Sequence, residues 1–360
     1  KKNKQLHKTI DKASAIYNHC IALHKRYYKI YGKHISNYSL QKHMTKLKKL
    51  RKYKFWNDVP SQAIQDISTR IDNGYKKFFK KKNDAPPSFR KKIKYKSVML
   101  KQAGWAIISF NTIRIGKHIY KFSTSRPMEG DIKTVTIKRD SLGDIYLFFT
   151  CDVNEPMPDR ITLGKSTGID FGLKTFLTFS DGSEAISPLF FKQGINNIKR
   201  ANKNLSSKKK GSNNRRKARI NLARVHKKIT NRRLDYHFKL AHSMCSEYQY
   251  IAYEDLNLNG MKKLWGKKIS DLAFGNFILI LEHEAKKLGT TTIKIDRWFP
   301  STKTCNCCGA INNTLSLRDR FWICSCGTHH NRDHNAAINI EREGASSLKL
   351  GDVSQVETLA

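Results

Sequence analysis

The sequence predicts an α+β protein of several domains, and three observations support this prediction. The chain has 360 residues, which allows two or three domains and a sizeable core. Apolar residues recur at helical spacing over residues 1–82, and short runs of β-branched and aromatic residues follow between Val98 and Val153. Five of the eight cysteines fall within 22 residues near the C-terminus, a pattern typical of a metal site in a reducing compartment.

Residues 1–82 are expected to form helices. The first keeps apolar residues at helical spacing from Ile10 to Cys20, a second is expected over Ser39–Lys52, and Asn57–Ser61 separates it from a third. The third helix has a clear apolar stripe, predicted to face the core: Ala63, Ile64, Ile67, Ile71, Tyr75 and Phe78. The lysine-rich opposite faces are either solvated or bind nucleic acid. The absence of any glutamate before Glu129 favours nucleic acid.

A linker is expected at Asp84–Pro87, and after it a small barrel or curved sheet. Its strands are predicted at Ala106–Phe110, Thr112–Ile115, Ile119–Phe122, Thr134–Ile137 and Ile145–Cys151. The Arg, Lys, Tyr and Trp residues interleaved there suit an RNA or DNA backbone. A plain structural β domain is the alternative.

One acidic residue lies inside an apolar strand. The strand is predicted at Gly168–Gly172 with Asp170 in its middle, and a second strand follows at Thr175–Phe179. Asp181-Gly182 predicts a hairpin turn into a third short strand near Ala185–Ile186. Burying a carboxylate among apolar residues is costly unless it is paired or binds a metal, so Asp170 is a candidate functional residue.

A long basic section, Phe191–Leu240, keeps apolar residues at helical spacing and predicts a helical hairpin with its turn at Lys208–Lys217. Sixteen Lys and Arg and no acid lie from Lys192 to Arg233, which is too one-sided for a merely solvated face. We expect this section to line a groove that holds a nucleic-acid duplex. The candidate nucleic-acid-binding residues are Lys208, Lys209, Lys210, Arg215, Arg216, Lys217, Arg219, Arg224, Lys227, Lys228, Arg232 and Arg233.

The chain then alternates between strands and helices. An apolar strand is predicted at Tyr248–Tyr253 and ends on Glu254. A loop is expected over Leu256–Trp265, and a well-patterned helix over Phe274–Leu288, closed by a glycine. A further strand is predicted at Thr290–Asp296, directly before the cysteines.

The clustered cysteines predict one structural zinc site. Two pairs, one with two intervening residues and one with one, are separated by fifteen residues and would supply the four thiolates of a closed tetrahedral site: Cys305, Cys308, Cys324 and Cys326. Cys307 is a spare that could replace a neighbour, and His329 or His330 could replace a weak ligand, which we rank lower. Four ligands without an open position favour a structural over a catalytic metal.

Three acids stand at element ends or within strands: Asp170, Glu254 and Asp333. Hydrolysis of a phosphodiester with two Mg²⁺ ions needs such a set, in which one carboxylate bridges the metals and the others hold them. Each acid alone is more often structural, and Asp333 alone fits a helix N-cap. Their order and context favour a magnesium site.

The charge of the chain points to nucleic acid. The net charge is +40, from 69 Lys and Arg against 29 Asp and Glu. A protein this basic repels itself unless a polyanion neutralises it, and binding through phosphates is strongly salt-dependent. No apolar run reaches about 18 residues, so no membrane span is predicted. The chain begins with Lys1, from which we expect it to start inside a longer product.

Five stretches together resemble one known family. They are GIDFGLKTF at Gly168–Phe176, IAYEDLNLNGM at Ile251–Met261, FPSTKTCNCCG at Phe299–Gly309, FWICSCGTHHNRDHNAAIN at Phe321–Asn339, and the basic run at Ser207–Arg233. On these stretches the C-terminal half resembles the TnpB proteins of insertion sequences, RNA-guided DNA nucleases thought ancestral to type V CRISPR effectors. The sections before it fit the family's order.

The resemblance implies an RNase H-like (RuvC) nuclease domain split in sequence by a zinc ribbon, with an N-terminal helical recognition lobe and a small β-barrel wedge domain. The recognition lobe would cover residues 1–84 and the wedge domain 85–160. The nuclease domain would cover 161–303, with its basic hairpin at 191–240, and then 329–360 with the C-terminal tail, the ribbon lying at 304–328. The family has a first wedge strand before the helices, so residues are expected to be missing before Lys1.

The resemblance also implies a Mg²⁺-dependent endonuclease of a transposable element. Asp170, Glu254 and Asp333 would be its catalytic acids and hold two Mg²⁺ ions, beside one structural Zn²⁺. The expected partners are a guide RNA from the transposon end and double-stranded target DNA carrying a short adjacent motif. One or two protein copies on a guide both fit. A bacterial member would act in the cytoplasm or nucleoid, and a eukaryotic Fanzor relative in the nucleus.

Two other functions remain as alternatives. Relatives whose nuclease site is broken act as RNA-guided DNA-binding repressors, but the three acids are complete here. A transposase that joins DNA ends itself is permitted by the acids, whereas the ribbon between the second and third acid argues against it. Many relatives have Asp where this chain has Asn331, but the metal-binding acid matches Asp333.

Overall fold

The structure, a computed structural model, describes residues 3–82, 85–124, 127–153, 165–316 and 318–347. The chain divides into two units, Lys1–Glu155 and Pro156–Ala360, each with its own hydrophobic core. No helix among the described residues combines the length and apolar character needed to cross a membrane.

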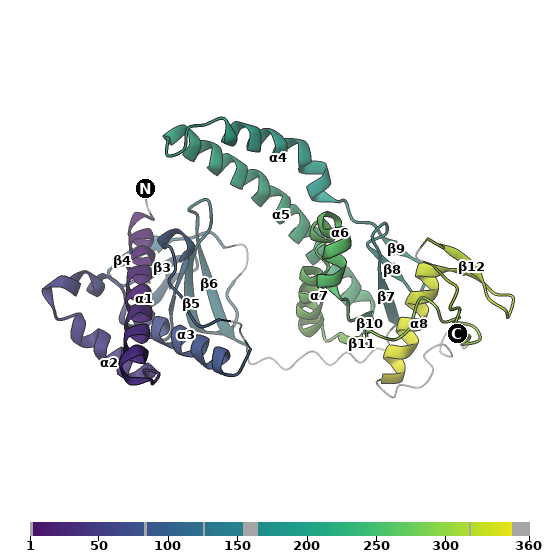
Figure 1. The fold of residues 1–360 in the computed structure, drawn as a ribbon, viewed down its shortest axis with the longest axis horizontal. Coiled ribbons are helices and arrows are strands. Elements are labelled where there is room, and N and C mark those ends of the chain that lie inside the picture. The colour runs from purple at the N-terminus through teal and green to yellow at the C-terminus, as the bar shows by residue number, and fades with distance from the viewer. Residues whose placement is uncertain (1–2, 83–84, 125–126, 154–164, 317, 348–360) are drawn as a thin grey trace. The chain divides into compact units, whose positions relative to one another are not determined.

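The first unit begins with the expected helices. They are α1 (Lys4–Tyr31), α2 (Asn37–Leu47) and α3 (Ser61–Phe79), with a 3-10 helix η1 (Arg51–Asp58) before α3 (Figure 1). The second helix is shorter than predicted. It starts where the Ser36 hydroxyl accepts a hydrogen bond from the Ser39 amide, 3.1 Å away, and the chain then turns so that Trp56 of η1 is buried.

The β section of this unit consists of two antiparallel three-stranded sheets. One contains β1 (Ser97–Leu100), β5 (Asp131–Arg139) and β6 (Ile145–Asp152), after a short 3-10 helix η2 (Lys92–Lys94). The other contains β2 (Trp105–Ser109), β3 (Thr112–Ile115) and β4 (His118–Lys121). Strand β1 was not predicted. Helices and sheets share one core rather than forming two separate ones, because apolar residues of both meet in a single cluster.

The second unit is built on a five-stranded sheet in the order β11-β10-β7-β8-β9 (Figure 1). Its strands are β7 (Ser166–Phe171), β8 (Leu177–Phe179), β9 (Glu184–Ala185), β10 (Tyr250–Glu254) and β11 (Thr291–Ile295). Strands β7, β10 and β11 are parallel, and β8 and β9 are antiparallel to their neighbours. The strands predicted at Gly168–Gly172, Thr175–Phe179 and Ala185–Ile186 correspond to β7, β8 and β9, and the predicted turn at Gly182 is present.

Helices cover both faces of this sheet. On one face α5 (Asn213–Glu247), α6 (Leu258–Leu272) and α7 (Phe274–Leu288) contribute to the large apolar cluster that includes Phe171 and Phe176. On the other face α8 (Arg332–Ser347) packs its Ile340 against Ala252 and Ile295. A two-stranded ribbon, β12 (Phe321–Ile323) and β13 (His329–Asn331), precedes α8 in the chain, and Cys324 and Cys326 lie in the turn between its strands.

Two predicted boundaries in this unit are wrong. Leu256–Trp265 is a helical segment rather than a loop, because α6 begins at Leu258, where the Asn257 side chain accepts a hydrogen bond from Gly260 N at 3.0 Å. The basic hairpin consists of α4 (Phe190–Ser206) and α5 (Asn213–Glu247). Its turn is shorter than Lys208–Lys217, because the Ser212 hydroxyl caps α5 by accepting from Arg215 N at 3.1 Å.

Candidate active site and metal centre

The three candidate carboxylates lie on elements that meet at one face of the sheet of the second unit. In strands, successive side chains point to opposite faces. Ile169 and Tyr253, which pair across β7 and β10, face the large apolar cluster, so Asp170 and Glu254, the next residue of each strand, face the side covered by α8. Asp333 lies in the first turn of α8.

A glycine allows α8 to approach this face closely. A Cβ atom on Gly168 would clash with the backbone of α8 at Ala337 and Glu341. Because Ala337 lies about one turn after Asp333, the close approach brings Asp333 toward Asp170, two residues after Gly168 on the same strand face. A second glycine, Gly344, faces Ala252 of β10 in the same way.

The carboxylates affect each other's charge. Burial, with the negative charges of Glu254 and Asp333, raises the pKa of Asp170 to about 8, although the positive charge of Arg332 opposes the shift. Burial also raises the pKa of Glu254, against the hydrogen bond that the Ser301 hydroxyl donates to it. Three acids crowded in a partly buried place thus disfavour full ionisation in the absence of a cation.

Asp333 has cationic partners of its own. It forms ion pairs with Arg320 of the ribbon and with Arg332, whose Nε lies 3.4 Å from Oδ1. Asp333 is not the cap of its helix: the Asn331 side chain takes that role and accepts a hydrogen bond from Asp333 N at 3.1 Å. Asn331 therefore acts as the N-cap of α8.

The donor set of this site fits magnesium. It consists only of carboxylate oxygens, which Mg²⁺ prefers, and a divalent cation would offset the repulsion that raises the pKa of Asp170. The oxygen atoms of the three carboxylates lie farther apart than the ligand atoms of a closed metal site. Among the described residues, the four cysteines alone form a group whose ligand atoms all lie within 4.8 Å of one another.

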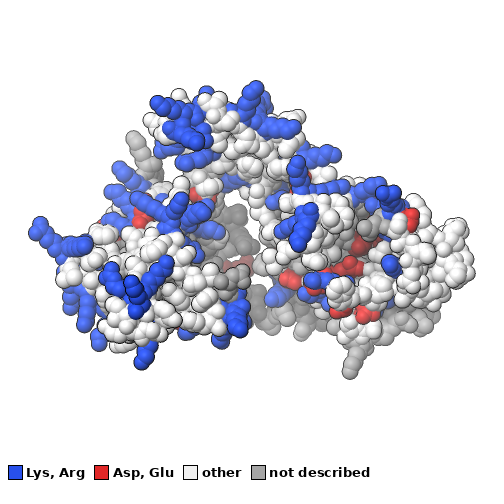
Figure 2. All heavy atoms as spheres, in the orientation of Figure 1, with Lys and Arg blue, Asp and Glu red and all other residues white. Residues whose placement is uncertain are grey.

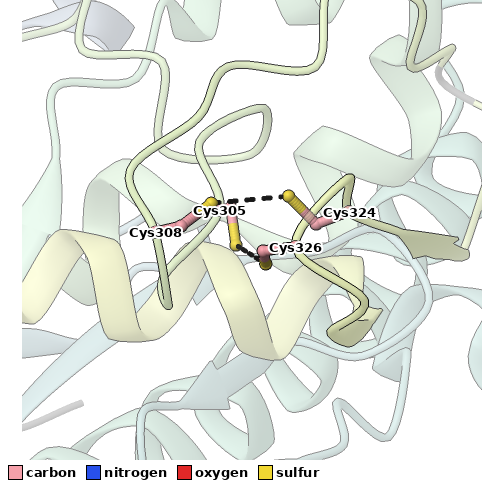
Figure 3. A group of neighbouring side chains, drawn as sticks. All are labelled: Cys305, Cys308, Cys324 and Cys326. Carbon is pink, nitrogen blue, oxygen red and sulfur yellow. Dashed lines mark hydrogen bonds between the residues drawn. The ribbon is translucent and has the colours of Figure 1, made fainter.

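The four predicted cysteines converge from two turns (Figure 3). The Sγ atoms of Cys305 and Cys326 are 3.8 Å apart and those of Cys308 and Cys324 are 3.6 Å apart. A tetrahedral zinc with Zn–S bonds of about 2.3 Å requires sulfur atoms about 3.8 Å apart, so the four thiols fit this ion.

The spare candidates lie outside the ligand set. Cys307 is exposed, and its backbone amide lies 3.4 Å from the sulfur of Cys305. His330 Nε2 lies 3.1 Å from the same sulfur and its ring packs on Trp322, as an outer partner of a ligand would.

Comparisons with known proteins place the chain in a family. The model of OrfB_IS605, described as a probable transposase, matches residues 148–264, and the model of the Cas12f1-like TNB domain matches residues 274–340. A protein of Streptomyces pristinaespiralis whose name describes an RNA-guided DNA endonuclease is 30% identical over 318 residues, covering 86% of this chain and 78% of that protein. The chain belongs to the TnpB family.

Other members and a solved structure agree with this assignment. The TnpB-like protein L79 of Acanthamoeba polyphaga mimivirus is 30% identical over 245 residues, which cover 62% of this chain but 46% of the viral protein. The structure of Cas12f1 in a complex with guide RNA and target DNA has a TM-score of 0.60 at 17% identity. It covers 94% of this chain and 82% of that one, and shows the mixed α+β fold.

This TnpB chain carries its most basic section on the α4–α5 hairpin, where Lys and Arg side chains crowd the surface (Figure 2). Eight of the twelve candidate residues are exposed: Lys209, Lys210, Arg216, Lys217, Arg219, Arg224, Lys228 and Arg232. The other four, Lys208, Arg215, Lys227 and Arg233, are partly buried.

Three of the candidate arginines also support the hairpin itself. Arg215 donates to the carbonyl oxygens of Leu205 and Lys208, both at 2.9 Å, and so closes the turn. Arg233 donates to the carbonyl oxygen of Ser270 at 3.0 Å, and Arg232 lies 5.1 Å from the ring centre of Phe190. We therefore expect the other exposed candidates, rather than these three arginines, to contribute most to binding nucleic acid.

A basic hollow in the first unit was missed by sequence reasoning. It lies between α2, η1 and the first turn of α3, has a volume of about 840 Å³, and is lined by residues that include four cations and no acid: Gln41, Met44, Thr45, Lys48, Lys49, Arg51, Lys54, Asn57, Ser61, Ile64 and Gln65. The sequence signal was the run of Lys and Arg before Trp56, but its concave shape depends on the packing of three elements.

Sequence reasoning also missed two side chains that contact the acids from a distance along the chain, Ser301 and Arg320. Ser301 stands 47 residues from Glu254, and Arg320 stands 13 residues before Asp333. Ser301 belongs to the stretch FPSTKTCNCCG, but nothing in the local pattern assigns it a partner.

Proposed function

We propose that this chain is an RNA-guided DNA endonuclease that hydrolyses phosphodiester bonds at Asp170, Glu254 and Asp333. The observation that carries the proposal is the convergence of three carboxylates from β7, β10 and α8 on one sheet face, where two of them raise the pKa of the third. The name of the Streptomyces relative and the nucleic-acid complex of the Cas12f1 neighbour support it.

In this proposal the three carboxylates hold two Mg²⁺ ions. Bound there, the metal would supply an activated water and stabilise the charge that develops on the leaving oxygen. Asp170 would release its proton as the cation binds, because a nearby positive charge favours the ionised carboxylate. Ser301 orients Glu254, and Arg320 neutralises Asp333.

The remaining parts would hold the substrates. The exposed cations of the α4–α5 hairpin would bind the backbone of a guide–target duplex, and the basic hollow of the first unit offers a second place for phosphates. The guide would be a transposon-end RNA, and the protein would read a short motif beside the target. Zinc at the four cysteines would hold the ribbon together without taking part in chemistry.

Cleavage by an Asp170→Ala variant tests the carboxylate site. The protein is purified with the RNA that accompanies it from its native locus, and cleavage of matching plasmid DNA is measured in Mg²⁺. We expect one dominant RNA in both preparations and cutting by the unchanged protein alone, with RNA binding equal in the two. Cleavage retained by the variant would contradict the proposed metal site, and a mixture of cellular RNA removed by salt would contradict the guided activity.

A further inference from the structure

Two buried amides on α8 connect it to the segment that enters the cysteine site. Asn335 and Asn339 are 2% and 5% exposed and lie one helical turn apart. Asn339 Nδ2 donates to the carbonyl oxygens of Ser301 and Thr304, at 2.8 and 2.7 Å. Asn335 Nδ2 donates to the Thr304 carbonyl at 2.8 Å.

Asn335 also bonds on the other side of a zinc ligand. Its Oδ1 accepts a hydrogen bond from the backbone amide of Asn306 at 3.0 Å. Because Thr304 and Asn306 flank Cys305, one buried side chain fixes the chain immediately before and after the first cysteine of the site.

The same segment reaches the carboxylates along two routes. Ser301, itself 2% exposed, donates its hydroxyl to Glu254 while its carbonyl oxygen accepts from Asn339. Along the second route, Arg320 of the ribbon pairs with Asp333. The carbonyl oxygen of Arg320 also accepts a hydrogen bond from Arg332 N at 2.9 Å. Both acids are therefore contacted by residues whose positions depend on the cysteine segment or the ribbon.

Buried hydrogen-bonded amides of this kind hold one geometry, since each broken bond leaves an uncompensated polar group. Without metal, the four thiols no longer hold their two turns together. The segment 301–306 would then keep its hydrogen bonds to α8 but lose the attachment through Cys305. Movement of that segment would displace the hydroxyl that orients Glu254.

We propose that Ser301, Asn335 and Asn339 are positioning residues that couple the cysteine site to the carboxylate site, so that zinc at the first tightens divalent-cation binding at the second. The inference rests on the proposed function, because it needs the carboxylates to bind a cation. Coupling between two ligands is reciprocal, so a cation at the carboxylates strengthens zinc binding by the same factor.

The test measures the affinity for Mn²⁺, as a spectroscopic substitute for Mg²⁺, on the full chain free of RNA. Free Mn²⁺ is counted by electron paramagnetic resonance for zinc-loaded protein and for protein depleted of zinc, and circular dichroism checks that both are folded. We expect zinc depletion to weaken Mn²⁺ binding by about fivefold or more. Competition with a chromogenic zinc chelator, with and without Mn²⁺, should give the same factor.

Variants identify the route. Ser301→Ala removes the hydroxyl on Glu254 but keeps the carbonyl that α8 binds, and Asn339→Ala removes both of that amide's bonds. Both should bring the zinc-dependent factor close to one. Ile340→Val, a buried neighbour on the same helix outside this network, should keep the full factor.

Equal Mn²⁺ affinity with and without zinc in the unchanged protein would overturn the inference and leave the proposed function intact. Full coupling in both Ser301→Ala and Asn339→Ala would overturn the assigned route. If no Mn²⁺ binding depends on Asp170, tested with Asp170→Ala, the proposed function fails and this inference with it.

Discussion

The carboxyl group of Asp170 holds its proton more tightly in the folded protein than in the unfolded chain, with a pKa of about 8 instead of 3.8. Between about pH 4 and pH 8 the folded state therefore binds the proton that the unfolded state has released. Without a divalent cation, this group makes the free energy of unfolding fall as the pH rises through that window. The burial of Asp170 therefore lowers the free energy of unfolding of the cation-free protein in this pH window, and a bound cation would restore it.

The variant Asp170→Asn should remove this pH dependence, because an amide has no proton to lose. In magnesium-free buffer at pH 8 we expect it to be more stable than the unchanged protein by at least about 1 kcal/mol, with a smaller difference near pH 5. Thermal unfolding across pH measures this. Added Mg²⁺ should stabilise the unchanged protein alone. Parallel pH profiles for the two proteins would contradict the assignment of the shift to Asp170.

The cysteines differ sharply in placement although they are close in sequence. Cys308 Sγ lies 3.6 Å from Cys324 Sγ inside the group of four, whereas Cys307 lies outside that group. We expect Cys307→Ser to retain about one zinc per chain and Cys308→Ser to lose it, since a closed site needs all four thiolates. Elemental analysis of purified protein gives the zinc content. Loss of zinc in Cys307→Ser would show that the spare cysteine is a ligand.

At the scale of elements, the candidate active site depends on how α8 lies against the sheet. No property of α8 alone places Asp333 beside Asp170; the missing side chain of Gly168 on β7 permits it. An apolar pattern along one helix does not say which strand that helix packs on.

The variant Gly168→Ala should displace α8. Its new Cβ would clash with backbone atoms of Ala337 and Glu341, which cannot move as a side chain can. We expect a loss of about 1–3 kcal/mol of stability, or more, together with loss of DNA cleavage. Chemical unfolding measures the first. Gly266→Ala in α6 is the matched control, because its Cβ meets no atom within 4 Å and should leave stability unchanged or slightly higher. Equal stability of the two variants would contradict the close approach.

At the scale of the whole molecule, the charge of +40 is divided unevenly, and the stretch from Lys192 to Arg233 in the α4–α5 hairpin carries sixteen Lys and Arg without an acid. If only the total charge attracts RNA, every surface cation contributes equally to RNA binding. If the hairpin forms a specific binding face, cations on the hairpin contribute more than cations elsewhere.

Reversing two charges on the hairpin should weaken RNA binding more than reversing two elsewhere. We compare Arg219→Glu/Arg224→Glu with Lys286→Glu/Lys287→Glu at the end of α7, all four exposed and the net change equal. The hairpin variant should bind guide RNA more weakly and lower the slope of log K against log salt by about two, one for each lost phosphate contact. Filter binding at several salt concentrations measures both. Equal effects would mean that only net charge matters.

The sequence by itself determined the family, the mixed α+β class, the four cysteines that converge, and most strands and helices of the second unit. These follow from local signals: metal ligands are chemically distinctive, and helices and strands have different apolar periods. The tertiary structure alone decided that the helices and sheets of the first unit share one core, that α6 replaces a loop, and that Ser301 and Arg320 contact Glu254 and Asp333. Such contacts join residues far apart in the chain, so they depend on strand order and helix packing rather than on any local pattern.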